Sequence, residues 1–287
     1  MGLHPRISLL IGILCISIFP VLVKWTPVSG VSAAYYRMLI GLLGLLPYAL
    51  WSRQLSLPPK HLWLPIAICG ILFATDISIW NLSIQYSNAT QATLLTNLSP
   101  IWVGVGAFLF MPNKPKIYFW IGTAVALLGM VVLIGLDTFT EMRFDRGFSL
   151  AILSGILYAA YMLVSKRVLN HISIVPFMTY CMAVSSLYLL LTCLYFDLPI
   201  SGFSSSIWTA FTIQGLICQL LGWLTINFAI QRMDAQRVSL ALLSQSIFTA
   251  LIAYSFINEP ITWSMALGGF IILIGIGITF RNARNKV

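Results

Sequence analysis

Ten apolar stretches, each about 20 residues long, follow one another along the 287-residue chain. A helix needs about 20 mostly apolar residues to cross the hydrocarbon core of a bilayer. Lipid offers no hydrogen bonds to peptide groups, so a spanning segment is a helix or part of a closed barrel. The alternating pattern of a barrel strand is missing here. The sequence therefore predicts an all-α polytopic membrane protein with spans at residues 7–25, 31–51, 62–85, 88–111, 117–136, 147–168, 174–195, 206–230, 236–257 and 262–281.

The composition excludes several other classes of protein. Only 8% of the residues are charged, whereas ordinary globular domains carry about a quarter. The net charge of +9 is spread singly or in pairs between apolar stretches, which argues against a nucleic-acid-binding face. The five cysteines form no C-x-x-C pair and all lie in apolar stretches. We therefore expect no metal, no cofactor, no disulfide and no nucleic-acid partner.

The loops predict the orientation of the chain, because Lys and Arg concentrate in cytoplasmic loops. With the N-terminus inside, twelve Lys and Arg residues fall in cytoplasmic segments, and only Arg143 and Arg146 fall outside. Ten spans then return the chain to its starting side. Both termini are expected in the cytoplasm.

An internal repeat divides the sequence. A shift of 146 residues aligns residues 85–132 with residues 231–278 without a gap, so that Gly122 meets Gly268 and Gly129 meets Gly275. The chain is thus predicted to hold two five-helix domains, at 1–139 and 146–287. Five is an odd number, so the second copy enters the membrane inverted. Inverted repeats are typical of secondary transporters, whose substrate site lies near the midplane between the repeats.

Particular residues within the repeats resemble a known family. The segment ATLLTNLSP at 92–100, with Gly122 and Gly129, resembles the EamA repeat of the drug/metabolite transporter superfamily. The segment from Ser239 to Phe256, followed by Asn258-Glu259-Pro260, resembles it more closely. Arg37 matches an arginine often found in the first repeat. The departures from the family pattern are Asn113 for a glutamate, Tyr180 for an arginine, and Cys15-Ile16 for a Trp-Gly pair.

The resemblance implies a ten-helix carrier of the bacterial inner membrane that is usually an exporter and works by alternating access. It does not imply a particular cargo, since members of the family move amino acids, amines, nucleosides, cofactors and drugs.

Asp76 is the strongest candidate for a functional residue. It lies about 14 residues from the cytoplasmic start of its span, or about 21 Å into the bilayer. A charge at that depth costs at least about 2.5–3.5 kcal/mol on insertion scales. It is predicted to couple transport to protons or to bind a substrate ammonium. The alternative is a structural partner for Arg37 or for a polar group on a neighbouring helix.

Asp76 shares one helical face with Phe73 and Trp80. The repeat counterpart of Phe73 is Gln219, and Trp223 lies beside that second stripe. Two facing stripes predict a small-molecule cavity with aromatic walls and a few fixed polar groups. Both tryptophans can cover a cation or stack on a ring, although Trp is also common in the interfacial belt.

Further polar side chains lie within the spans. Arg37 is predicted to bind a substrate carboxylate or to pair with Asp76 in one conformation, and the alternative is snorkelling toward the outer headgroups. The remaining candidates for substrate binding are Asn97, Tyr158, Asn227 and Gln245, for which helix packing in lipid is the alternative role. Pro20 and Pro100 lie within spans and are expected to permit bends.

The sequence offers little for other functions. An intramembrane aspartyl protease needs two membrane carboxylates, and only Asp76 is available. No H-E-x-x-H motif or Walker loop is present in the sequence, so we do not expect an enzyme. The leading hypothesis is a proton-coupled secondary carrier, monomeric or homodimeric, that exports an amino acid or related amine. The alternatives are a multidrug exporter of lipophilic cations and an uptake or exchange carrier for a scarce metabolite.

Overall fold

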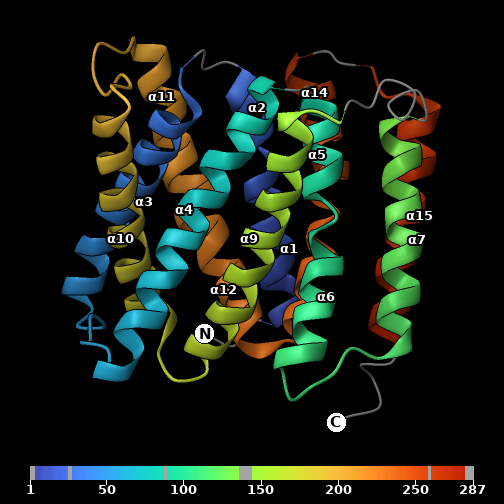
Figure 1. Ribbon diagram of the computed structural model, residues 1–287, viewed down its shortest axis with the longest axis horizontal. Helices are drawn as coiled ribbons and strands as arrows, with labels where there is room; N and C mark the ends of the chain where they lie inside the picture. The colour runs from blue at the N-terminus through green and yellow to red at the C-terminus, as the bar shows by residue number, and fades with distance from the viewer. Residues whose placement is uncertain (1–3, 25–27, 87–88, 136–143, 258–259, 282–287) are drawn as a thin grey trace. The chain divides into compact units, whose positions relative to one another are not determined.

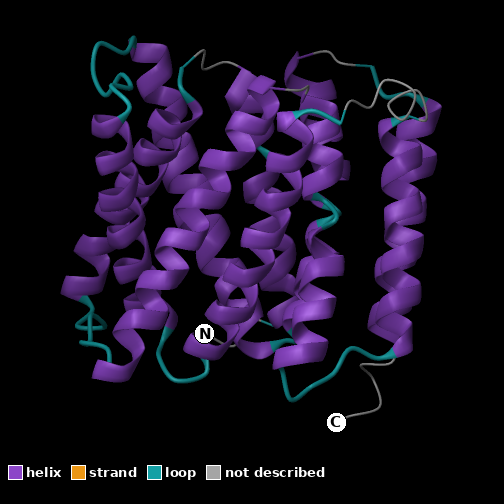
Figure 2. Ribbon diagram, viewed as in Figure 1, coloured by secondary structure: helices purple, strands orange, loops and turns teal. Residues whose placement is uncertain are grey.

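The computed structural model describes residues 4–24, 28–86, 89–135, 144–257 and 260–281. Within these ranges the regular structure is helical, and no β-strand occurs (Figure 2). Ten segments of the described chain are long and apolar enough to cross a membrane. This confirms the predicted all-α polytopic class. The segments are Pro5–Val23, Gly30–Trp51, Lys60–Ser83, Gln91–Phe110, Ile117–Ile134, Arg146–Leu169, Ile174–Tyr195, Ser205–Arg232, Ala235–Phe256 and Trp263–Arg281.

Several spans consist of more than one helix (Figure 1). The helices in chain order are α1 (Pro5–Ser17), α2 (Phe19–Lys24), α3 (Gly30–Trp51), the short 3₁₀ helix η1 (Lys60–Leu62), α4 (Trp63–Tyr86), α5 (Ala89–Thr96), α6 (Ser99–Phe110), α7 (Ile117–Ile134), α9 (Arg146–Leu169), α10 (Ile174–Tyr195), α11 (Ser205–Ile213), the π-helix η2 (Gln214–Gly222), α12 (Trp223–Arg232), α13 (Ala235–Leu242), α14 (Gln245–Ile257) and α15 (Trp263–Arg281).

The two predicted bends occur beside the prolines. The first span is interrupted at Ile18, between α1 and α2, two residues before Pro20. The fourth span is interrupted at residues 97–98, between α5 and α6, and Pro100 follows in the first turn of α6. Proline has no backbone N–H and cannot continue the hydrogen-bond ladder of the preceding turn. A helix break is thus found at both sites where a bend was expected.

The ninth span carries a third interruption, which the sequence analysis did not predict. It falls at residues 243–244, between α13 and α14, and these positions are the 146-residue counterparts of 97–98. No proline lies at this break. Instead, the Ser244 hydroxyl donates a hydrogen bond of 2.7 Å to the carbonyl oxygen of Ala241. The fourth helix of both repeats is therefore discontinuous at the same place, a feature of transporter folds built from repeats.

The chain divides into two compact units, each of which takes segments from both repeats. The first unit comprises residues 1–81 and 164–232, and the second comprises residues 82–163 and 233–287. The second and third spans of each repeat fall in the first unit, whereas the fourth and fifth spans of each repeat fall in the second. The predicted domains at 1–139 and 146–287 describe the repeats of the sequence, and the compact units cut across them.

In the second unit, the last spans of the two repeats, α7 and α15, pack against each other. A β-carbon added to Gly122 would lie 2.5 Å from the carbonyl oxygen of Gly275, and one added to Gly129 would lie 2.8 Å from that of Gly268. The glycine nearer the start of α7 thus meets the glycine nearer the end of α15, and the reverse holds for the other pair. Equivalent helices of the two repeats therefore run antiparallel, as inverted repeats require.

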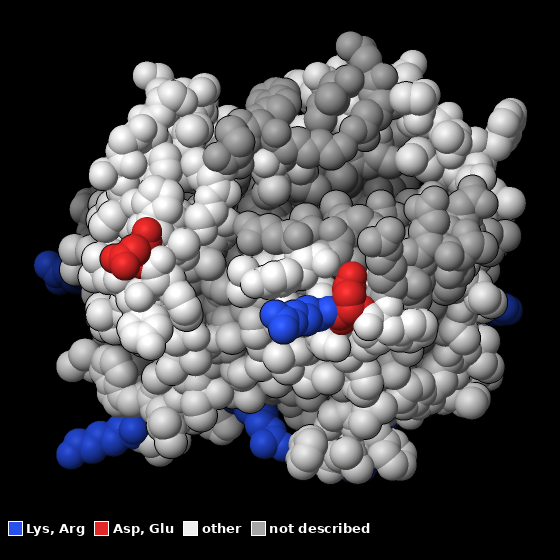
Figure 3. Space-filling model, turned by 45° about the horizontal axis from the view of Figure 1, so that its top comes forward, with Lys and Arg blue, Asp and Glu red and all other residues white. Residues whose placement is uncertain are grey.

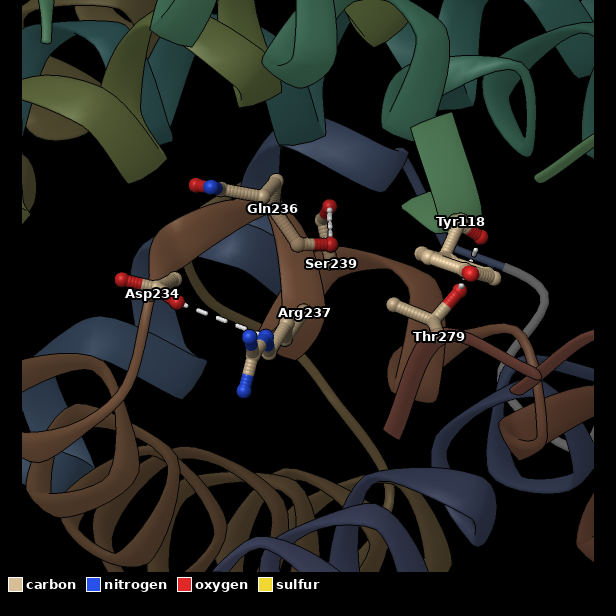
Figure 4. Close-up of polar contacts among 6 residues, drawn as sticks. All are labelled: Tyr118, Asp234, Gln236, Arg237, Ser239 and Thr279. Carbon is tan, nitrogen blue, oxygen red and sulfur yellow. Dashed lines mark hydrogen bonds and ion pairs between the residues drawn. The ribbon is translucent and has the colours of Figure 1, made fainter. Parts of the chain in front are cut away.

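Polar contacts secure the ends of this helix pair and the start of α13 (Figure 4). The Thr279 hydroxyl donates to the carbonyl oxygen of Tyr118 over 3.4 Å and so joins α15 to the first turn of α7. Asp234 precedes α13, and its carboxylate lies 3.3 Å from the Arg237 guanidinium. A carboxylate at a helix N-terminus also interacts favourably with the helix dipole.

The first unit is joined by hydrogen bonds to backbone carbonyls. Ser8 of α1 donates to the carbonyl oxygen of Thr225 in α12 over 2.9 Å, and Ser185 of α10 donates to that of Gly70 in α4 over 2.8 Å. Such bonds satisfy hydroxyl groups that lipid cannot solvate. On the face seen in Figure 3, few of the described side chains are charged.

We predict that Gly275→Ala destabilises the protein, because the added methyl group would lie 2.5 Å from the carbonyl oxygen of Gly122 and 2.6 Å from the amide nitrogen of Ala126. Backbone atoms cannot move aside as a side chain can, so we expect a loss of about 1–3 kcal/mol. Gly277 lies two residues further along α15 and has open space at its β-position. Gly277→Ala is the matched control, and equal unfolding temperatures of the two variants in detergent would contradict this packing.

Candidate functional site

The close approach of α3 and the π-helix η2 places the first candidate side chains together. A β-carbon at Gly41 would lie 3.0 Å from Cγ of Gln219, and one at Gly215 would lie 2.6 Å from Cβ of Ile40. The absence of side chains at these two glycines lets the backbones approach, which is the usual way in which helices associate in lipid. The approach places the side chains of Arg37 and Gln219 in contact.

Arg37 is held inside the first unit by two neighbours. Its side chain is only 5% exposed, and its Nε donates a hydrogen bond of 3.0 Å to Oε1 of Gln219. The guanidinium lies over the ring of Phe19, 4.4 Å from the ring centroid. Such a cation–π contact contributes about 0.5–2 kcal/mol. The alternative of snorkelling toward the headgroups does not describe this side chain.

Asp76 lies in the same unit and interacts electrostatically with Arg37. Its side chain is 7% exposed, so both charges are removed from water. A buried charge is strongly disfavoured unless an opposite charge and hydrogen bonds stabilise it. The electrostatic interaction with Arg37 agrees both with the structural role considered for Asp76 and with a binding role in which a substrate exchanges with the pair.

Aromatic rings from three helices, α2, α4 and α12, pack together in the same unit. The Phe73 ring of α4 meets the Trp223 ring of α12 edge-on, with centroids 4.6 Å apart. The Phe19 ring of α2 lies 6.0 Å from the Trp80 ring of α4. The third and eighth spans therefore contact each other through these two rings, and the cavity expected between the stripes stays a prediction. Trp223 is 5% exposed and lies inside the unit rather than in an interfacial belt.

The π-helix is a local irregularity that shapes this site. Gln214–Gly222 form nine residues of π-helix between α11 and α12. π-Helical turns are rare and occur frequently at functional sites. This segment carries Gln219 and ends one residue before Trp223. Asn227 follows one turn later in α12 and is also buried.

The structure places seven of the ten predicted site residues in the first unit and three in the second. Asn97 stands at the break between α5 and α6, where its side-chain amide contacts the sulfur of Met130 at 4.0 Å. Gln245 is the first residue of α14, directly after the break at 243–244, and Tyr158 lies in α9. Both side chains are half-buried. Two of the three thus adjoin a break between helices.

Phe19 is a site neighbour that the sequence analysis missed. It is the first residue of α2 after the break at Ile18, and the turn at this break brings its ring over Arg37. The available signal was its place next to Pro20, since the bend itself was predicted. Among the described residues, no three His, Cys, Asp or Glu side chains gather as a metal site requires.

A family model described as the EamA-like transporter family matches the chain twice, over residues 6–135 and 145–281. The chain belongs to the EamA-like transporter family. It is thus a multi-pass membrane protein of the drug/metabolite transporter superfamily, a family of carriers for small molecules. The two matches also correspond to the two repeats found in the sequence.

Curated relatives of this EamA-family chain are named as transporters. An "Uncharacterized transporter" of Archaeoglobus fulgidus is 24% identical over 251 residues, which cover 86% of this chain and 86% of the relative. The "Uncharacterized transporter YdfC" of Bacillus subtilis is 25% identical over 258 residues, covering 88% and 83%. A solved crystal structure matches with a TM-score of 0.84 at 16% identity over 98% of this chain and 97% of that one, which supports the fold alone.

We predict that Gln219→Met lowers the stability of the protein. Methionine keeps the shape of the side chain but cannot accept the hydrogen bond from Arg37 Nε, and a buried donor left without a partner costs about 1–3 kcal/mol. Gln54 makes only an exposed bond to Tyr48, so Gln54→Met should change stability by about 0.5 kcal/mol or less. Thermal unfolding in detergent measures both, and a Gln219→Met protein as stable as wild type would contradict the assigned contact.

Proposed function

We propose that this EamA-family transporter exports a small amino acid or a related amine across a bacterial cytoplasmic membrane in exchange for protons, with both termini in the cytoplasm. The orientation is supported by the excess of Lys and Arg in the loops on that side. The location is supported by relatives in bacteria such as Bacillus subtilis. The inverted repeats support alternating access.

The observation that carries the proposal is the pair of opposite charges buried in one unit. Asp76 and Arg37 are each less than a tenth exposed and interact electrostatically. An amino acid carries the complementary charges, with its ammonium suited to Asp76 and its carboxylate suited to Arg37. Binding would therefore replace one internal charge pair by two substrate pairs, so that no charge is left buried without a partner.

The proton enters at the same carboxylate. Facing the cytoplasm, the ionised Asp76 binds the substrate ammonium. Facing outward, a proton neutralises Asp76 and releases the ammonium, and the protonated carboxyl returns through the membrane without a net charge. A neutral carboxyl costs far less to bury than a carboxylate. Each cycle thus carries one substrate outward and one proton inward.

The rings around the pair would hold the apolar part of the cargo. Trp223 and Phe73 meet edge-on, and Trp80 lies against Phe19. Aromatic faces bury large apolar area and also attract cations. The same rings support the second candidate, export of lipophilic cations, because such a cargo needs Asp76 and aromatic walls but has no use for Arg37.

We predict that Asp76→Asn abolishes transport driven by a pH gradient, because asparagine does not take up or release a proton. Binding of an ammonium-bearing substrate should also weaken, by about 10-fold to 100-fold for the loss of one charge-assisted bond. The measurement is substrate flux in proteoliposomes with and without an imposed pH gradient. Asp234→Asn is the control, since it removes a partly exposed carboxylate at the start of α13. Wild-type flux and pH dependence in Asp76→Asn would overturn the assignment.

Experiments on cells that lack the protein distinguish the two candidate cargoes. Amino-acid export predicts that the free amino acid accumulates inside such cells when they are fed dipeptides, and that the wild-type gene restores the normal level while an Arg37→Met gene does not. Export of lipophilic cations predicts sensitivity to those compounds instead, and little dependence on Arg37. Intracellular amino-acid pools and growth inhibition are the two measurements, and sensitivity without accumulation would favour the second candidate.

A further inference from the structure

Gln214 is a buried amide that the site described above does not use. Its side chain is 0% exposed, and among the described residues neither its Oε1 nor its Nε2 has a hydrogen-bond partner. Gln214 is the first residue of the π-helix η2. Buried polar groups are nearly always hydrogen-bonded in native proteins, so each exception calls for an explanation.

The packing of α3 against the eighth span locates this amide along the membrane normal. The Tyr36 ring stacks on the Phe211 ring with centroids 5.1 Å apart, and Ile40 meets Gly215. Both pairs differ by 175 residues, so the two segments run parallel in a fixed register. That register places Gln214 level with residues 37–40, beside the start of the Arg37 side chain.

The neighbours of Gln214 on its own helix locate the face that it occupies. Residues three and four apart share a helical face. Phe211, three residues earlier, stacks on Tyr36, and Gln219, one π-turn later, accepts a hydrogen bond from Arg37. Gln214 lies between these two contacts, on the segment that packs against the part of α3 that carries Arg37.

Gln219 provides the contrast, since it lies one π-turn further along the same helix. Its amide oxygen accepts from Arg37, and its side chain is equally buried. Two buried glutamines thus lie one π-turn apart on the segment that packs against α3, one bonded to Arg37 and one with both polar atoms unused. Removing a partner from a buried polar group costs stability, whereas replacing an unsatisfied group by an apolar one does not.

We propose that Gln214 is a further substrate-binding residue, which together with Arg37 binds the carboxylate of a zwitterionic cargo. The Nε2 group donates to a carboxylate oxygen, and Oε1 accepts from the adjacent ammonium or another donor of the same molecule. The inference rests on the proposed function and narrows it. It requires a cargo that bears a carboxylate, and a simple amine would leave the Nε2 donor of Gln214 unused.

The first test compares the unliganded stability of two matched variants. Gln214→Met removes an unsatisfied amide and should raise the unfolding temperature in detergent by about 2 °C or more, whereas Gln219→Met should lower it. Gln214→Leu is the second variant if the methionine protein is not obtained. A Gln214→Met protein that unfolds at a lower temperature than wild type would show that the amide bonds within the protein. That result would overturn the proposal independently of any ligand-binding measurement.

The second test uses three probes of one shape: L-leucine, 4-methylpentanoate, which lacks the ammonium, and 3-methylbutylamine, which lacks the carboxylate. Gln214→Met should raise the dissociation constants of L-leucine and 4-methylpentanoate by about 10-fold, and should leave that of 3-methylbutylamine within twofold. Unchanged L-leucine binding in the variant would overturn the proposal. Absence of binding of all three probes to wild-type protein would count against the proposed function instead, and the comparison of unliganded stability would then decide the role of Gln214.

Discussion

Lipid cannot form hydrogen bonds, and a polar group of this chain within the bilayer is therefore satisfied only where the protein or a bound molecule supplies its partner. The constraint acts first on the backbone and makes each span helical. It acts next on side chains: Ser8, Ser185 and Thr279 all donate to backbone carbonyls of neighbouring helices. The constraint is strongest for charged side chains. The buried Arg37 donates to Gln219, lies over the Phe19 ring and interacts electrostatically with Asp76.

Helix association in lipid depends on close backbone contact rather than on the hydrophobic effect, and the glycines of the two repeats supply it. Gly122 and Gly129 meet Gly275 and Gly268 in an antiparallel pair within the second unit. In the first unit, Gly41 and Gly215 bring α3 against the π-helix and so position Arg37. Close backbone contact at glycines thus packs two helices in the second unit and positions a site residue in the first.

The discontinuous helices add a second consequence of the repeat. The fourth span of each repeat is interrupted at equivalent positions, 97–98 and 243–244. At both breaks the backbone continues in tighter bonds between residues three apart, from Leu98 N to the carbonyl oxygen of Leu95 and from Ser244 N to that of Ala241. Asn97 lies at the first break and Gln245 lies directly after the second. A polar side chain therefore adjoins each position where a helix is interrupted.

The sequence predicts most of the fold, because span length, loop charge and the 146-residue repeat are local properties. The break at 97–98 follows from Pro100. No proline lies at the break at 243–244. The sequence predicts this break only when the one at 97–98 is transferred to the second repeat by the 146-residue shift. The π-helix at Gln214–Gly222 has no local signature and depends on how η2 packs against α1 and α3.

The sequence predicts which residues belong to the site better than it predicts their contacts. Depth and spacing selected Asp76, Arg37, Trp223 and Gln219, and the structure places all four in one unit. The bond from Arg37 to Gln219 joins residues 182 positions apart, which no local pattern specifies. Phe19 and Gln214 were missed because an aromatic or an amide within an apolar span carries no sign of what it touches.

The central claim is that Asp76 takes up a proton at a site where the substrate also binds. Labelling of the wild-type membrane protein with a hydrophobic carbodiimide, followed by mass mapping of the peptides, tests it directly, since this reagent attacks protonated carboxyl groups in apolar surroundings. The account predicts that Asp76 is labelled, that labelling falls as the pH rises, and that a transported amino acid protects it. Labelling of Asp76 that is absent, or that no amino acid reduces, would contradict the account.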